Sequence, residues 1–465
     1  MNILRISFIF LFLSQAMQAQ SPRMEVKFSE PLAVFVFVEQ CSPLKPENAF
    51  RTLFENSKYY SDKYKNLLAL FDTLEFNYVY PYDEFPFGSK QPGMTKSILK
   101  KNLIASANLK DFKTLSLGTI PNAKLLQLSA ILYEFQQVYR ELIYQPNKAL
   151  FTKQLGALSD FLRTRNLVQY FDKALIFYKS YWEESIPFEL VFYPQPNAKS
   201  FSAEAFYNNA VSGIPKDLSN YNALFSVMMH EVYHIFYDEQ PLKVKNNVAL
   251  WFQSNPSNCS VYAYHLLNEV LATALGTGYV YESLKGKMDE DDWYDHKYIN
   301  LMAKKIYPLL RDYISQGKAL DQDFVTSYLK VYEENFSGWL IELDNLMCYR
   351  AVISDDKHDN QMLAKNYAYS SLSQFEDEIT ENALERLKNT ALTKMILLSK
   401  NNEAQLKLIK NKFPELKTWK YKAKQDFLYA VFLEDKTQLI IVNSVKQSAD
   451  QILQGRVLLP SKEGN

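Results

Sequence analysis

The stretch that decides the fold is Met228–Gln240, MMHEVYHIFYDEQ, in which two of the chain's five histidines stand four residues apart. Residues four apart on an α-helix lie on one face of it. On a helical wheel of about 100° per residue, His230 and His234 lie about 40° apart, and Glu231 lies about 100° from His230 on the flank of His234. Two interpretations fit this pattern, a zinc site and an ordinary buried helix.

The apolar residues around the motif separate these interpretations. Seven large side chains occupy one broad arc opposite the histidines: Leu224, Phe225, Met228, Met229, Val232, Ile235 and Phe236. On the histidine side lie only Ala223 and Val227. The helix therefore has a complete apolar face without its histidines, which favours the zinc interpretation.

A third ligand is needed, because a hydrolytic zinc site has three protein ligands and an open position for water. The stretch Asn268–Gly276, NEVLATALG, supplies Glu269, which lies 35 residues after His234 on a predicted helix. Ala272 and Gly276 are small and allow another helix to approach closely. His265 lies four residues before Glu269 on the same face, so it remains an alternative ligand, a pocket residue or a core histidine.

Together these two motifs resemble those of the gluzincins, the thermolysin-like branch of zinc peptidases. That family has HExxH on one helix and Asn-Glu-x-x-Ala/Ser-x-x-x-Gly on a later one. The resemblance covers about fifty residues and the strand before them. It implies a zincin-like catalytic unit with one Zn²⁺ held by His230, His234 and Glu269, and with Glu231 as the general base.

The chain departs from the family pattern in its supporting residues. Thr273 stands four residues after Glu269, where the thermolysin-like enzymes have an aspartate that orients a ligating histidine. A threonine hydroxyl accepts the imidazole N–H without the charge. The tyrosine or histidine that stabilises the tetrahedral intermediate stays open among six residues: Tyr262, Tyr264, Tyr279, Tyr332, His296 and His358.

Length and charge limit the class of protein. A chain of 465 residues predicts two domains, or one catalytic unit with a large helical extension. The 52 basic residues balance 52 acidic ones, so no nucleic acid partner is expected. Only 12 glycines accompany 32 tyrosines and 31 phenylalanines, which favours an α+β fold that is predominantly α-helical.

The N-terminus has the layout of a secretory signal peptide over residues 1–19. Arg5 precedes an apolar run, Ile6–Leu13, which is far shorter than the roughly 20 residues that span a bilayer. We therefore expect an exported protein, periplasmic or secreted. No later segment is long and apolar enough to span, so no stable membrane span is expected after cleavage.

Residues 20–185 are predicted to form a mostly helical N-terminal region. Within it, Leu32–Val38 is an apolar block that fits a strand or a short buried helix, and Tyr78–Thr95 fits an ordered loop. Three amphipathic helices are expected between Asn122 and Trp182, with breaks at Gln145–Lys148 and Arg163–Asn166.

Residues 186–400 are predicted to form the catalytic region. A strand is expected in Ile186–Pro196 and a second in Ala203–Pro215, whose Ala205–Ile214 would be the edge strand that pairs with a peptide substrate. The HExxH helix begins at an N-cap, Ser219 or Asn220. Three further expectations follow: the second helix ends near Gly276 or Gly278, the acidic run Lys287–Asp295 is a solvated loop, and Tyr298 to Lys400 is helical.

Residues 401–465 are predicted to form a C-terminal region with a β-hairpin in Asp426–Ser444. The chain has three widely spaced cysteines, Cys41, Cys259 and Cys348, which exclude a disulfide framework and a cysteine-based metal site. Three unpaired, mostly buried thiols are favoured over one bridge and a spare thiol.

The sequence therefore predicts an exported zinc-dependent peptidase that acts on peptide or protein substrates. The Gly-x-Met-Glu-Asn motif of the gluzincin aminopeptidases is absent upstream of the site, which favours an endopeptidase. A catalytically inactive zincin-like protein that binds metal or a partner is the alternative, and a helical scaffold without metal is the third. Substrate specificity and oligomeric state cannot be read from the sequence.

Overall fold

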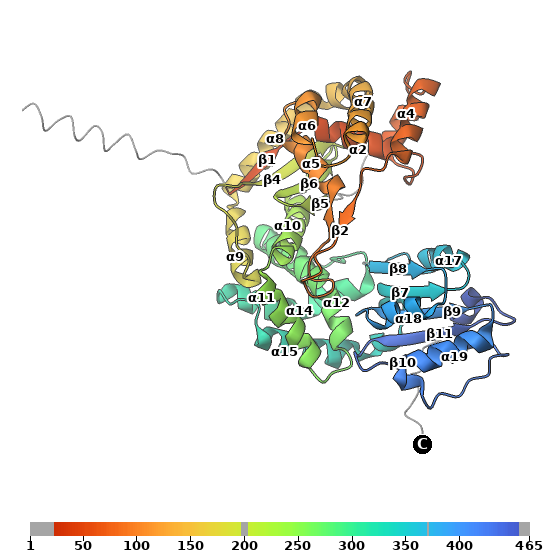
Figure 1. Ribbon diagram of the computed structural model, residues 1–465. Coiled ribbons are helices and arrows are strands. Elements are labelled where there is room, and N and C mark those ends of the chain that lie inside the picture. The colour runs from red at the N-terminus through yellow and green to blue at the C-terminus, as the bar shows by residue number, and fades with distance from the viewer. Residues whose placement is uncertain (1–22, 197–202, 370–371, 455–465) are drawn as a thin grey trace, which may run out of the picture.

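The computed structural model describes residues 23–196, 203–369 and 372–454, so the expected signal peptide at 1–19 lies outside it. The fold is α+β and predominantly helical (Figure 1). Two larger sheets have the strand orders β1-β4-β6-β5 and β10-β11-β9-β7-β8, and β2 with β3 makes a small third one. No helix in these described ranges is both long and apolar enough to cross a membrane.

The N-terminal part is built mainly from helices, as predicted. They are α2 (Glu30–Cys41), α3 (Ala49–Glu55), α4 (Asp62–Thr73), α5 (Thr95–Ala105), α6 (Leu109–Leu115), α7 (Asn122–Tyr139), α8 (Gln145–Thr164) and α9 (Val168–Tyr178). The ambiguous block Leu32–Val38 lies in α2, where the Ser29 hydroxyl accepts a hydrogen bond from the Leu32 N–H. Every residue of this block is buried, which explains why it shows no helical periodicity.

The break expected at Gln145–Lys148 is absent. Helices α7 and α8 are joined without interruption by a π-helical turn, η1 (Arg140–Tyr144), and Pro146 stands in the first turn of α8. The π turn already interrupts the regular i to i−4 hydrogen bonds, so the missing N–H of proline is tolerated there. The second break is confirmed, since α8 ends at Thr164 and α9 begins at Val168.

The first sheet consists of β1 (Met24–Lys27), β4 (Phe188–Pro194), β6 (Asn209–Ile214) and β5 (Ala203–Phe206). Strand β4 confirms the strand predicted in Ile186–Pro196. The prediction of Ala205–Ile214 as the edge strand is wrong for β6, which pairs with β4 on one side and β5 on the other. The edge is β5, because the chain turns back after Phe206. Pairing of β1 with β4 carries this sheet across the boundary expected at 185/186.

The helices that follow are α10 (Tyr221–Asp238), α11 (Leu242–Ser254), α12 (Ser260–Thr273), α13 (Tyr281–Lys285), α14 (Lys297–Ser315) and α15 (Gln322–Phe336). Of the two predicted N-caps, Asn220 caps α10, and its side-chain oxygen accepts from the Ala223 N–H. The helix end expected near Gly276 or Gly278 is wrong. A π-helical segment, η2 (Ala274–Val280), connects α12 to α13, and the helix stops at Gly286, whose φ is 80°.

The helical prediction for Tyr298 to Lys400 is wrong beyond Leu346. Strands β7 (Tyr349–Ser354), β8 (Leu372–Glu376) and β9 (Thr393–Leu398) form a sheet with β10 (Phe427–Phe432) and β11 (Gln438–Asn443). Two short helices, η3 (Ser337–Ile341) and α16 (Leu343–Leu346), precede these strands. Between the strands lie α17 (His358–Asn366), α18 (Glu381–Lys388), α19 (Asn402–Lys412) and η4 (Pro414–Leu416), and α20 (Ala449–Leu453) follows them. Only β10 runs antiparallel to its neighbour.

Both faces of this five-stranded sheet are buried. On β9, Met395 and Leu397 join the core of α10, α12 and α14, while Ile396 and Leu398 join a separate core under α18 and α19. In Figure 1 the sheet accordingly lies beside the green helices of the middle of the chain. The sheet also runs across the boundary expected at 400/401, since β9 pairs with β11. All three cysteines are buried and unbridged.

The loop predicted at Tyr78–Thr95 is ordered and contains β2 (Val79–Tyr80) and β3 (Gly93–Met94). It is fastened to the end of α10, where the Lys90 ammonium pairs with Asp238 at 3.0 Å. Lys245, which is 1% exposed, donates hydrogen bonds to the backbone oxygens of Ser89 and Tyr237. Burial lowers the pKa of Lys245 to about 7.

This buried lysine predicts a pH-dependent stability difference. Between pH 7 and about 10.5 the unfolded chain holds a proton on Lys245 that the folded chain has released, so this group adds stability as the pH rises. Lys245→Met removes that dependence. We expect the melting temperature of the variant, minus that of the wild type, to fall between pH 7 and pH 10. The exposed neighbour Lys243 is the control, and an equal slope for Lys243→Met would contradict the assignment.

Candidate metal centre

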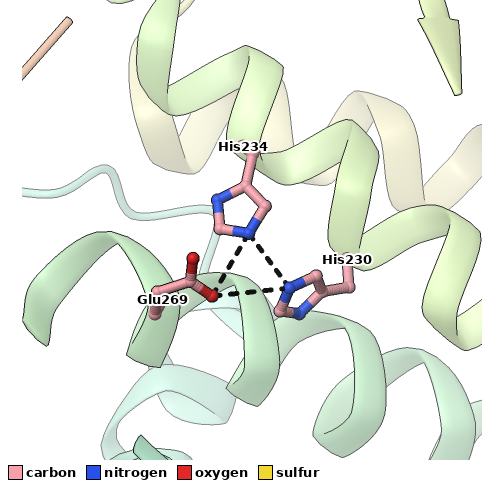
Figure 2. A group of neighbouring side chains, drawn as sticks. All are labelled: His230, His234 and Glu269. Atoms are coloured by element: carbon pink, nitrogen blue, oxygen red, sulfur yellow. Dashed lines mark hydrogen bonds and ion pairs between the residues drawn. The ribbon is translucent and has the colours of Figure 1, made fainter. Parts of the chain in front are cut away.

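The three residues predicted as metal ligands converge on one point. His230 and His234 project from successive turns of α10, and Glu269 faces them from α12 (Figure 2). The two imidazole Nε2 atoms lie 3.0 Å apart, and Glu269 Oε2 lies 3.4 Å from that of His234 and 3.7 Å from that of His230. Among the described residues, these three are the group of histidines, cysteines and carboxylates close enough to hold one metal ion.

These separations fit a zinc ion. Ligands at 2.0–2.2 Å from one ion, in tetrahedral geometry, are separated by about 3.3 Å. Glu269 Oε2 is buried, and the atoms that face it are the Nε2 atoms of His234 and His230, which also face each other. A buried carboxylate is costly unless a positive charge satisfies it, either a proton on His234 or a bound cation. The residues present therefore fit the metal that the sequence predicts.

The groups that orient the histidines come from α12. The Nδ1 of His234 lies 3.1 Å from Asn268 Oδ1, and His230 is hydrogen-bonded to the backbone of Ala272. Thr273, the residue predicted to support a ligand, has a buried hydroxyl without a hydrogen-bond partner. The expectation that Thr273 supports a ligand is therefore wrong, because the hydrogen-bond partners of the two imidazole rings are Asn268 and the backbone of Ala272. One helix thus supplies the third ligand and both orienting groups.

The site holds closely coupled charges. Burial, together with the neighbouring His234, lowers the pKa of His230 to about 3 and keeps that ring neutral. Burial disfavours the charged form of Glu269, but the two histidines lower the pKa of its carboxyl to about 2. Burial likewise opposes charge on His234, while Glu269 raises its pKa. Without a metal, the proton on His234 therefore balances Glu269, and a bound cation would take its place.

Glu231 lies beside the ligands without belonging to the cluster. Burial raises the pKa of its carboxyl to about 7, and the nearby carboxylates of Glu269 and Glu204 add to this effect. A carboxyl group with a pKa near neutrality is suited to accept a proton from water and then release it. Its place fits the role that the resemblance implies.

Close contact between two helices brings the ligands together. His230 lies opposite Ala272 and His234 opposite Asn268, so α10 and α12 run antiparallel. At Gly276, in η2, an added Cβ would lie 2.8 Å from His230 Cβ and 2.8 Å from the Ser226 carbonyl oxygen. The close approach predicted from Gly276 is confirmed. π-helical segments of this kind are frequent at functional sites.

His265 lies outside the ligand cluster. Its Nε2 lies 2.8 Å from the Ala391 carbonyl oxygen, and its ring stacks on Tyr349 with 4.6 Å between centroids. Burial lowers the pKa of His265 to about 4, so the ring is neutral. These contacts give His265 a packing role between α12 and the five-stranded sheet.

The six residues considered for stabilising the intermediate are engaged elsewhere. Tyr262 bonds Gln438, Tyr264 packs on Phe252, Tyr279 accepts from Lys173, Tyr332 accepts from Asn345, His296 stacks on Tyr369 and His358 bonds Asp356. The tyrosine that reaches the cluster is Tyr294, which hydrogen-bonds Glu269 and lies 6.0 Å from the His230 ring. Tyr294 falls in the acidic run Lys287–Asp295, which is a loop with mostly exposed acidic residues, as predicted. Its neighbour Trp293 is 6% exposed, so the two aromatic residues are the part of this loop that packs on the protein.

The contact at Gly276 generates a stability prediction. An alanine normally favours a helix over glycine, but here its Cβ would push His230 and α10 away. We expect Gly276→Ala to lower the unfolding free energy of the metal-free protein by about 1–3 kcal/mol. Gly156, in α8, has open space around its added Cβ. Gly156→Ala should instead stabilise by about 0.5–1 kcal/mol, and a stabilising effect of both substitutions in thermal denaturation would contradict the packing argument.

Comparison with protein-family models, with curated proteins and with solved structures finds no match for the chain. The case for a function therefore rests on the chemistry of the site.

Proposed function

We propose that the protein is an exported zinc-dependent peptidase that hydrolyses peptide bonds with a metal-activated water and Glu231 as general base. The observation that carries the proposal is the convergence of His230, His234 and Glu269 from two helices, with their ligand atoms facing one another. Export rests on the N-terminal pattern at residues 1–19. The proposed family is the gluzincins, on the two motifs alone.

The proposed reaction needs a Lewis acid and a group that transfers a proton, and different residues provide for each. A zinc ion held by His230, His234 and Glu269 would supply Lewis acidity to the scissile carbonyl and to the attacking water. Glu231 takes the proton from that water and passes it to the leaving amine. Its carboxyl group is protonated and deprotonated in turn, which its pKa near 7 supports.

We assign the edge that binds the substrate to β5 and no longer to β6. Strand β5 is the last in its sheet, packs on α10 and has its outer edge unpaired among the described strands. An extended peptide that paired with this edge would lie near α10, the helix that carries His230 and His234. Glu204 on β5 is tied to Lys100 at 2.7 Å, an ion pair that links the strand to α5. A peptide or protein substrate suits this geometry.

The competing proposal is a zincin-like protein that binds metal without cleaving. Two observations support it, Thr273 in place of an orienting aspartate and the absence of an identified group that stabilises the tetrahedral intermediate. Asn268 and the Ala272 backbone are the hydrogen-bond partners of the two imidazole rings, which weakens the first of these arguments. The two proposals differ in one measurable property, whether the metal-loaded protein turns over peptides.

Substitution of the base separates catalysis from metal binding. We expect wild-type protein to hold one zinc per chain by elemental analysis and to cleave members of a broad peptide library. Glu231→Gln should keep the zinc and lose at least a hundredfold in activity, since a general base contributes roughly 10²–10⁴-fold. His230→Ala should lose both. Zinc bound without cleavage in the wild type would support the non-catalytic alternative, and no bound zinc would support a scaffold without metal.

Metal removal gives a prediction that does not depend on activity. A ligand that binds only the folded state stabilises it by about 2.7 kcal/mol at a hundred times its dissociation constant. We expect zinc to raise the melting temperature of the wild type and of Glu231→Gln, and a chelator to reverse the change. His234→Ala should show no response to zinc. A similar zinc response in His234→Ala would place the bound metal elsewhere.

A further inference from the structure

A line of side chains connects Glu269 to the segment between α17 and β8. Tyr294, which precedes α14, donates a hydrogen bond to the Glu269 carboxylate. Tyr369, which lies between α17 and β8, donates in turn to the Tyr294 oxygen, and their rings are 6.5 Å apart at 88°. The third ligand is thus linked to a residue about a hundred positions later in the chain.

The last tyrosine of this line stands on a fixed platform. Its ring stacks on His296 with 3.8 Å between centroids and an interplanar angle of 19°. His296 is held in turn by the Tyr298 ring at 5.2 Å and by Cys348 Sγ, 3.6 Å from its Nε2. These contacts restrict the orientation of the Tyr369 ring and so the position of its hydroxyl oxygen.

The backbone at Tyr294 is fixed from another direction. Its neighbour Trp293 packs against η2 so closely that a Cβ on Gly278 would lie 2.9 Å from the indole ring. The Trp293 N–H also donates to Asn300 in α14. These contacts place the Tyr294 ring near His230, but they leave the direction of its hydroxyl group to its two hydrogen-bond partners, Glu269 and Tyr369.

We propose that Tyr369 is a positioning residue of the metal centre. By donating to Tyr294, it keeps the Tyr294 hydroxyl on Glu269 and so leaves Glu269 Oε2 directed at the two histidines. A hydroxyl that accepts a hydrogen bond becomes a stronger donor, so each bond of the line strengthens the next. This inference rests on the proposed zinc site, and it links that site to the segment that leads into β8.

The experiment compares zinc affinities. Wild type, Tyr369→Phe, Tyr294→Phe and the double variant are titrated with Zn²⁺ against a chromophoric chelator. Loss of a group that orients a ligand weakens metal binding roughly 10–100-fold, which we expect for Tyr294→Phe. We expect a loss of about three- to tenfold for Tyr369→Phe, because it acts through Tyr294. The double variant should match Tyr294→Phe alone, since the relay is already broken there.

The control is Tyr367→Phe, two residues away in the same segment, which should bind zinc as the wild type does. Phenylalanine at 369 keeps the stack on His296, so the melting temperature of the metal-free variant should stay unchanged. The visible absorption of the Co²⁺-loaded protein should shift in Tyr369→Phe and not in the control, which a merely structural role would not produce.

Two results overturn the inference alone: wild-type zinc affinity in Tyr369→Phe while Tyr294→Phe is weakened, or losses that add in the double variant. A wild type that binds no zinc overturns the proposed function and the inference together.

Discussion

The close approach of α10 and the α12–η2 helix at Gly276 is the constraint on which the metal centre depends. With no side chain at 276, the backbone of one helix rests on the Cβ of His230 and on the Ser226 carbonyl oxygen of the other. At that spacing, Glu269 Oε2 reaches the imidazole nitrogens of the two histidines at 3.4 and 3.7 Å. A wider spacing would leave Glu269 out of reach of both imidazoles. Gly276 therefore determines how close Glu269 lies to the two histidines.

The side chains that this approach brings together are not those that packing alone would favour. The approach buries a carboxylate beside two imidazole rings whose Nε2 atoms lie 3.0 Å apart, so the cluster needs a bound proton or a cation to balance its charge. Apolar side chains would fill the same space at lower cost. Strain of this kind is expected where residues serve a function, because a ligand repays the cost when it binds. The buried Glu231 beside the cluster adds a second charge that packing does not require.

What the sequence predicted well depended on local periodicity. The cap at Asn220, the helix that carries His230 and the small residue at Gly276 all act within one or two helical turns. Strands β7, β8 and β9 were missed, whereas the two strands in Asp426–Ser444 were predicted as a hairpin. Strand β9 is buried on both faces, so Met395–Leu398 reads as one apolar run without alternation. Tyr294 was missed because its hydrogen bonds join residues distant in the chain, and the acidic residues around it suggest a solvated loop. Supporting residues such as Asn268 became distinguishable from Thr273 only once the two helices were paired.

The division of the chain into a catalytic region and a C-terminal region also changes with the structure. Strands β7 and β9 have one face on the core of α12 and α14, and β11 completes that same face with Ile440 and Val442. A chain that ended at 400 would lack β10 and β11, so β9 would lose one of its two neighbouring strands. Apolar side chains of the sheet would then be exposed to water. Tyr369 precedes β8 in the chain and reaches Tyr294, so the proposed third ligand is also linked to the segment that leads into this sheet.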